Sequence, residues 1–115
     1  MTRTPKDIMS SYFAALRAKD FDEVENLLSD DFSATGPAGE TTDVKYYIEA
    51  IKKIFSTISD IEVQHMWVDG NDVITWVVVH MINMPSAFNL VIWSRIVNDK
   101  ITQVKVTFDP RSSQE

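Results

Sequence analysis

Residues 73–96 read VITWVVVHMINMPSAFNLVIWSRI, and this stretch decides the fold. It contains two runs rich in β-branched and aromatic residues on either side of Pro85-Ser86, a pattern typical of two antiparallel strands joined by a turn. A two-residue turn at Pro85-Ser86 predicts that Val77 lies opposite Ser94. Because side chains alternate along a strand, this register assigns every residue of both runs to one of two faces.

The two faces of this predicted hairpin differ in chemistry. The face that we expect to pack inward is apolar and uncharged, and it contains Val77, Val79, Met81, Phe88, Leu90 and Ile92. The opposite face is too aromatic to be simply solvated, because the wet face of an antiparallel sheet is normally polar. It contains Trp76, His80, Val91 and Trp93, and we expect it to form a homodimer interface.

Short turns divide the second half of the chain into strands. The pattern predicts strands over 61–68, 73–84, 87–97 and 101–108, separated by Asp69-Gly70-Asn71-Asp72, Pro85-Ser86 and Asn98-Asp99-Lys100. Connections this short favour an antiparallel meander.

The first half of the chain shows helical spacing instead. Apolar residues recur at three- and four-residue intervals over about 5–19, 21–28 and 44–58. Thr4-Pro5, Asp20 or Asp22, and Asp43 are suited to begin these helices. A short strand over 30–35 and a turn at 36–39 are expected between the second and third helices. The predicted fold is α+β, with helices against the concave side of a curved antiparallel sheet.

Composition excludes several classes of function. With 115 residues, 44% of them hydrophobic, the chain fits a single domain. It has no cysteine, hence no disulfide, thiol nucleophile or Cys-containing zinc site. A net charge of −6 with scattered basic residues argues against binding to nucleic acid or an anionic membrane. With no long apolar stretch or signal region, we expect a soluble cytoplasmic protein.

Short motifs in the first half resemble a known family. Tyr12-Phe13-Ala14-Ala15-Leu16, Lys19-Asp20-Phe21-Asp22 and Leu27-Leu28-Ser29-Asp30-Asp31-Phe32 resemble the opening of nuclear transport factor 2-like domains. This superfamily includes ketosteroid isomerases, SnoaL-like polyketide-cyclase relatives and limonene epoxide hydrolases. The resemblance spans about residues 5–110. It implies a cone-shaped, strongly curved sheet around an apolar cavity, and often a dimer through the outer sheet face.

The resemblance does not carry over the catalytic residues of two family enzymes. Ketosteroid isomerases use a carboxylate base and an oxyanion hole made of a tyrosine and a protonated aspartic acid. Tyr12 matches the tyrosine, but the other two positions fall near Gly36 and Ile92. The Asp-Arg-Asp arrangement of the epoxide hydrolases is absent from the matching stretches, 78–80 and 105–107. Both chemistries are therefore expected to be absent.

The expected site is an apolar pocket inside the cone. Its predicted lining is Tyr12, Leu16, Tyr47, Phe55, Val77, Val79, Met81, Phe88, Leu90, Ile92, Val104 and Phe108. Met66 and Met81 could give it an adaptable wall. Tyr12 could offer its hydroxyl to a ligand, or it could be a core residue whose hydroxyl has a protein partner.

Other polar residues are weaker candidates. His65 opposite Trp76 and His80 opposite Val91 are both expected on the outer face, although a one-residue bulge would reverse either assignment. Two histidines without a third ligand make a weak zinc site, so no metal or cofactor is expected. Glu62 and Gln64 are predicted to share the inner face with Met66, with Glu62 at the rim.

Two functions from different classes follow. In the first, the cavity binds a small apolar molecule with Tyr12 as a polar handle, as a carrier or as an isomerase or cyclase-type enzyme. In the second, side chains such as Phe13, Phe55, Phe88 and Phe108 fill the cavity, and the protein is a dimeric interaction module. An open cavity of several hundred Å³ would favour the first.

Overall fold

A computed structural model describes residues 4–36 and 39–108 of the chain. The helices are α1 (Pro5–Ala18), α2 (Phe21–Asn26) and α3 (Val44–Phe55). The strands are β1 (Leu28–Gly36), β2 (Gly39–Thr41), β3 (Ile58–Asp69), β4 (Asp72–Met81), β5 (Phe88–Val97) and β6 (Lys100–Phe108). Among the described residues, no helix has the length and apolar character needed to cross a bilayer.

The helices begin at the residues that the sequence indicates. Thr4 caps α1 because its Oγ1 accepts from the Asp7 backbone N–H at 3.1 Å, and the Asp7 carboxylate accepts from the Thr4 N–H at 3.3 Å. The Asp20 and Asp43 side chains cap α2 and α3 by accepting from the backbone N–H groups of Glu23 and Tyr46. Lys19 ends α1 in a left-handed conformation with φ of 58°.

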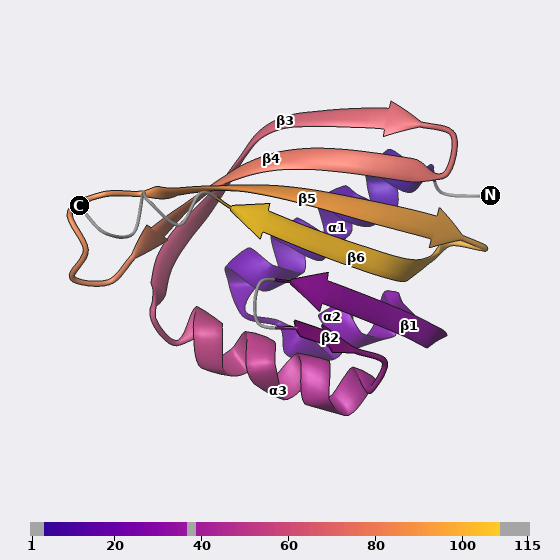
Figure 1. The fold of residues 1–115 in the computed structure, drawn as a ribbon, viewed down its shortest axis with the longest axis horizontal. Coiled ribbons are helices and arrows are strands. Elements are labelled where there is room, and N and C mark those ends of the chain that lie inside the picture. The colour runs from indigo at the N-terminus through magenta and orange to yellow at the C-terminus, as the bar shows by residue number, and fades with distance from the viewer. Residues whose placement is uncertain (1–3, 37–38, 109–115) are drawn as a thin grey trace.

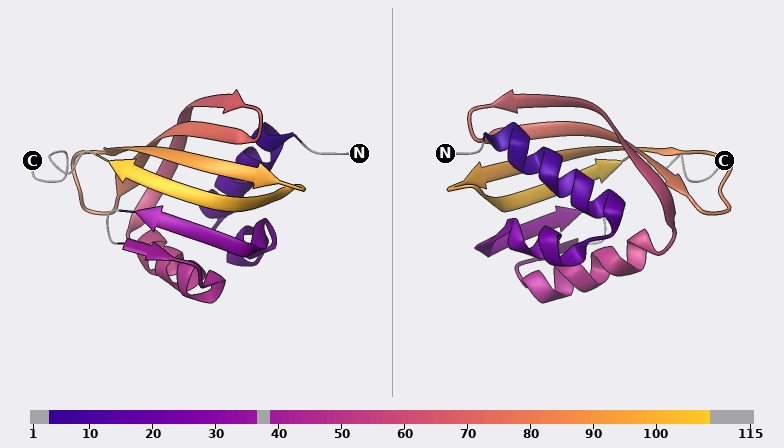
Figure 2. Two further views of the ribbon diagram at one scale, coloured as in Figure 1. Left: turned by 45° about the vertical axis from the view of Figure 1, so that its right-hand side comes forward. Right: turned by 180° about the vertical axis from the view of Figure 1, so that it is seen from behind.

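The six strands form one strongly curved sheet in the order β2-β1-β6-β5-β4-β3 (Figure 1). Strands β3 to β6 form the predicted antiparallel meander. All three helices lie on the concave side of the sheet, and α1 crosses it diagonally (Figure 2). The predicted α+β fold, a curved sheet wrapped around N-terminal helices, is confirmed.

The edge formed by β1 and β2 differs from the prediction in detail. Strand β1 begins at Leu28 and pairs with β6 in parallel, so the sheet is mixed. Strand β2, where no strand is predicted, pairs antiparallel with the end of β1. The third helix ends at Phe55, and Ile58 opens β3 instead of closing the helix.

The register of β4 and β5 also differs from the predicted one. Residues 82–87 connect the two strands, so the predicted two-residue turn at Pro85-Ser86 is wrong. Val77 lies opposite Leu90 rather than Ser94, a displacement of four residues. Because four is an even number, each side chain keeps its predicted face. Val77 and Ile92 are accordingly buried, whereas Trp76 remains 40% exposed.

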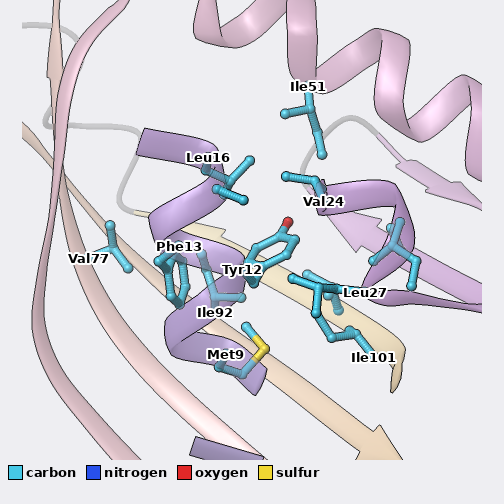
Figure 3. Close-up of a cluster of buried hydrophobic side chains, with 14 of the residues drawn as sticks. Met9, Tyr12, Phe13, Leu16, Val24, Leu27, Ile51, Val77, Ile92 and Ile101 are labelled. Atoms are coloured by element: carbon cyan, nitrogen blue, oxygen red, sulfur yellow. The ribbon is translucent and has the colours of Figure 1, made fainter. Parts of the chain in front are cut away.

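The core lies between the concave face and the helices. Its fully buried large side chains include Ile8, Met9, Val24, Phe32, Val73, Val77, Ile101 and Val104. Figure 3 shows how α1 supplies Met9, Tyr12, Phe13 and Leu16 to this cluster. One apolar side of α1 thus packs into the core, and the residues on its other side are not needed for that packing.

Candidate functional site

Helix α1 presents two different sets of side chains to its surroundings. Tyr12 and Leu16 lie one turn apart and are 3% and 4% exposed. Ser10, Ala14 and Arg17 share another side of the helix, because residues three and four apart lie on the same face. This second row faces strand β3.

The second row and β3 border an open cleft of about 590 Å³, here called the α1–β3 cleft. Its lining consists of Ser10, Phe13, Ala14, Arg17 and Ala18 from α1 and Ile61, Val63 and Met66 from β3. Small side chains at positions 10, 14 and 18 recur once per turn, so α1 does not fill the space in front of β3. The cleft is mostly apolar, with one cationic side chain in its lining.

Irregularities in β3 direct its side chains into the cleft. The register with β4 shifts between Val63 and His65, so Gln64 is an extra residue without an opposite partner. Val63 and Met66 therefore both face inward, opposite Val77 and Thr75, which are fully buried. A strand without the extra residue would turn one of these two side chains outward.

The same bulge corrects the prediction for the polar residues of β3. Glu62 and Gln64 do not share the inner face with Met66. Gln64 Nε2 donates to Glu62 Oε2 at 3.1 Å, and Glu62 Oε1 lies 3.3 Å from His80 Nε2 on β4. Glu62 is thus an exposed partner of a histidine rather than a rim carboxylate of the inner face.

The histidines lie on the outer face of the sheet. His65 is opposite Trp76 as predicted, and its ring stacks on Trp67 with centroids 5.4 Å apart. His80 is opposite Asp60 of β3 and not opposite Val91, because the long 82–87 connection ends the β4–β5 pairing at Val79.

Arg17 and Asp60 form an ion pair beside the α1–β3 cleft. Arg17 Nε donates to Asp60 Oδ1 at 2.9 Å, and Nη2 donates to Oδ2 at 3.3 Å. A backbone hydrogen bond from Ile61 and the Arg17 guanidinium lower the pKa of Asp60, against a smaller opposing effect of desolvation. Asp60 is therefore ionised near neutral pH, and one edge of the guanidinium is held in place.

Tyr12 and Tyr47 form a hydrogen-bonded pair on the opposite side of α1 from the cleft. Their hydroxyl oxygens are 2.6 Å apart. Burial raises the pKa of Tyr12 well above its ordinary value and that of Tyr47 to about 12. The rings pack edge-on to Phe13 and tilted against Phe32, respectively. In Figure 3 the Tyr12 hydroxyl points toward Val24 and Ile51, away from Val77.

The predicted pocket residues lie in the packed interior rather than around the cleft. Buried residues among them are Tyr12, Leu16, Phe55, Val77, Val79, Ile92 and Val104. Tyr47, Met81, Phe88 and Leu90 are partly buried, and the side chain of Phe108 lies outside the described residues. None of the described members lines the α1–β3 cleft. Met66, expected as an adaptable wall, does line it.

Sequence reasoning missed most of the cleft residues. Ser10, Ala14, Arg17 and Ala18 look like the solvated side of an amphipathic helix, because none of them is a large apolar residue. The available signal is their small size at four-residue spacing on a helix that crosses a sheet. Ile61 and Val63 required knowledge of the bulge.

The family model that describes the SnoaL-like domain matches residues 9–104. The chain belongs to the SnoaL-like domain family. This family lies within the nuclear transport factor 2-like superfamily that the opening motifs indicate. No curated protein matches the chain in sequence.

Solved structures agree with the SnoaL-like fold. A nuclear transport factor 2-like protein of unknown function from Cytophaga hutchinsonii is 23% identical, with a TM-score of 0.85 over 100% of this chain and 98% of that one. An LEH-like epoxide hydrolase from M. tuberculosis is 16% identical, with a TM-score of 0.76 over 91% and 82% of the two chains. A Catenulispora acidiphila protein with a ketosteroid isomerase-like fold, in complex with trimethylamine, is 16% identical, with a TM-score of 0.79 over 95% and 90%. At these identities the likeness concerns the fold.

Proposed function

We propose that this SnoaL-like domain binds a small, largely apolar molecule in the α1–β3 cleft. The observation that carries the proposal is a mostly apolar cleft of about 590 Å³ beside the buried hydrophobic core. Sites for small molecules usually have volumes of about 300–1,000 Å³ and mostly apolar walls with a few polar groups. Ser10 and Arg17 are the polar members of this lining. The trimethylamine complex of the Catenulispora protein supports the idea that such a fold can hold a small molecule.

The proposal is for binding, either as a carrier or as an enzyme of the isomerase or cyclase type. Proton transfer of the ketosteroid isomerase kind is not part of it, because Gly36 and Ile92 offer neither a base nor an acid. The Tyr12 hydroxyl, predicted as a polar handle, is hydrogen-bonded to Tyr47 across the helix from the cleft. A ligand site at Tyr12 would thus be separate from the α1–β3 cleft, and one experiment distinguishes the two sites.

The test uses a panel of hydrophobic ligands and the thermal shift that each produces. Ala14→Trp fills the α1–β3 cleft from an exposed position without removing core packing, and Ala18→Trp does so independently. Both should abolish the shift, whereas Tyr12→Phe should preserve it. Lys45→Trp on the exposed side of α3 is the matched control for the added indole. Loss of the shift in Tyr12→Phe with retention in both tryptophan variants would move the site to the tyrosine pair. Absence of a shift with every ligand would reject the proposal.

A second proposal concerns the outer face of the sheet, where we expect a second copy of the chain to bind. Its exposed apolar side chains are Trp67, Ile74, Trp76 and Val91, at 40–50% exposure. Trp93 lies among them between Arg95 and Lys105 at cation–π distances. Large exposed apolar patches mark interaction surfaces. If the cleft binds nothing, we propose that the protein is a dimeric interaction module that acts through this surface.

Sedimentation at micromolar concentration tests the dimer. The wild type should have twice the monomer mass, and Val91→Glu at the centre of the outer face should reduce it to that of the monomer. Ile54→Glu is the control, because Ile54 is equally apolar and 54% exposed but lies on α3. A monomeric wild type would defeat the dimer without affecting the cleft.

A further inference from the structure

The charged group at the α1–β3 cleft suggests which class of molecule fits there, a question that rests on the proposed binding function. Arg17 is the one ionisable residue in the cleft lining within the described chain. The remaining lining is apolar except for Ser10, which lies two turns away on the same face of α1. At 1.5 Å per residue, about 10 Å separates Ser10 and Arg17 along the helix. The lining thus combines one cationic side chain with a mostly apolar surface.

The guanidinium of Arg17 has unused donors. An arginine side chain has five N–H groups in a rigid, planar fork. Asp60 accepts two of them, from Nε and Nη2. Asp60 is the hydrogen-bond acceptor of this guanidinium in the described part of the chain, so Nη1 and the second N–H of Nη2 keep their capacity. These two nitrogens form an edge that matches the spacing of two carboxylate oxygens.

Asp60 acts on this edge in two opposite ways. It holds the guanidinium in one orientation, which reduces the entropy lost when a ligand binds. Its negative charge also opposes a second anion on the same guanidinium. Arg17 and Asp60 are both substantially exposed, with side-chain exposures of 62% and 37%, so solvent weakens this repulsion more than it weakens direct hydrogen bonds.

We infer that the ligand of the α1–β3 cleft is an apolar molecule with a carboxylate group, which pairs with the free edge of the Arg17 guanidinium. The apolar body lies along Ala14 and Phe13 of α1 and against Val63 of β3. A ligand amine would be repelled by Arg17, and a neutral molecule would leave the free edge to water. The carboxylate is favoured over both because it accepts two parallel hydrogen bonds from the planar guanidinium and carries the opposite charge.

Matched ligand pairs test this inference. Octanoate and octanamide, and 4-phenylbutyrate and its primary amide, are titrated calorimetrically into the full chain. Each acid should bind about tenfold more tightly than its amide, the difference that one partly exposed charge-assisted contact supplies. Arg17→Leu should remove this preference, so that each acid and its amide bind with similar affinity. Raised salt should weaken the acid more than the amide.

Asp60→Asn gives a further test. If Arg17 had only a structural role, this substitution would not change the affinity for the acid. The amide oxygen can still accept from Arg17 while the repelling charge is gone, so the acid should bind more tightly than to wild type. Equal affinity for acid and amide, or a preference that survives in Arg17→Leu, would overturn the inference and leave the proposed binding function standing. Failure of both acids to bind, while a neutral ligand of the hydrophobic panel gives a thermal shift, would overturn the inference alone. No binding by any ligand of either set would overturn both.

Discussion

The two sides of helix α1 illustrate how one short segment can serve two purposes. The side with Met9, Tyr12 and Leu16 is buried against the sheet and the other helices. The side with Ser10 and Ala14 consists of small, exposed residues and leaves the α1–β3 cleft open. The difference indicates that stability and ligand binding depend on different residues of the same helix. Substitutions on the two sides should therefore separate the two properties.

The largest expected effect is on the buried side. Leu16→Ala removes a side chain that is 4% exposed and leaves a cavity, which should lower the free energy of unfolding by about 2–5 kcal/mol. Ala14→Leu, two residues away on the cleft side of α1, should change it by no more than about 0.5 kcal/mol. Urea denaturation measures both variants. Similar losses in the two would mean that the cleft side is also part of the core.

The tyrosine pair should give the next largest effect. Tyr47→Phe leaves the buried Tyr12 hydroxyl without its partner, at a cost of about 1–3 kcal/mol. Removal of both hydroxyls in the double variant should restore part of that loss, because no unpaired polar group remains. A double-mutant cycle measures this coupling. Additive losses would contradict a direct bond between the two hydroxyls.

The general architecture could be predicted because it depends on local patterns. Helix caps at Thr4 and Asp43 and the alternation in residues 73–96 are each encoded within a few positions. The faces of β4 and β5 were assigned correctly even though the turn was wrong, because the register error was even. The cytoplasmic location and the division into one domain stay predictions.

The site could not be predicted because it depends on features that no local pattern reveals. The extra residue at Gln64 turns Glu62 outward and Val63 inward, and an alternating sequence does not mark it. The parallel pairing of β1 with β6 joins residues far apart in the sequence. The cleft arises where small residues of α1 meet β3, a matter of helix placement rather than of composition.

An alkaline titration should show a smaller effect that comes from the buried side of α1. Both buried tyrosines have a raised pKa, and that of Tyr47 rises from 10.0 to about 12. A group with a raised pKa stabilises the folded state fully below the unfolded pKa, and this contribution is lost as pH rises through the folded pKa. Stability should therefore fall by about 1 kcal/mol between pH 9 and pH 11 from Tyr47 alone. The fall should be much smaller in the double phenylalanine variant, as urea denaturation at each pH can measure.

The smallest effect concerns the ion pair beside the cleft, compared with a second ion pair on the sheet. The pKa of Asp60 is lowered first by the Ile61 backbone and only then by Arg17, whereas Arg95 is the largest cause of the lowered pKa of Asp72. Both depressed carboxyl groups contribute stability above their unfolded pKa, near 3.8, and lose it as pH falls through the folded value.

Carboxyl NMR titrations of the arginine variants should therefore differ. Arg95→Leu should raise the pKa of Asp72 most of the way back to 3.8. Arg17→Leu should leave the pKa of Asp60 well below 3.8. An equal rise of the two pKa values would show that Arg17 lowers the pKa of Asp60 as much as Arg95 lowers that of Asp72. The expected inequality has a functional meaning. An aspartate is ionised at neutral pH even at its ordinary pKa, so Asp60 can orient the Arg17 guanidinium without needing Arg17 for its own charge.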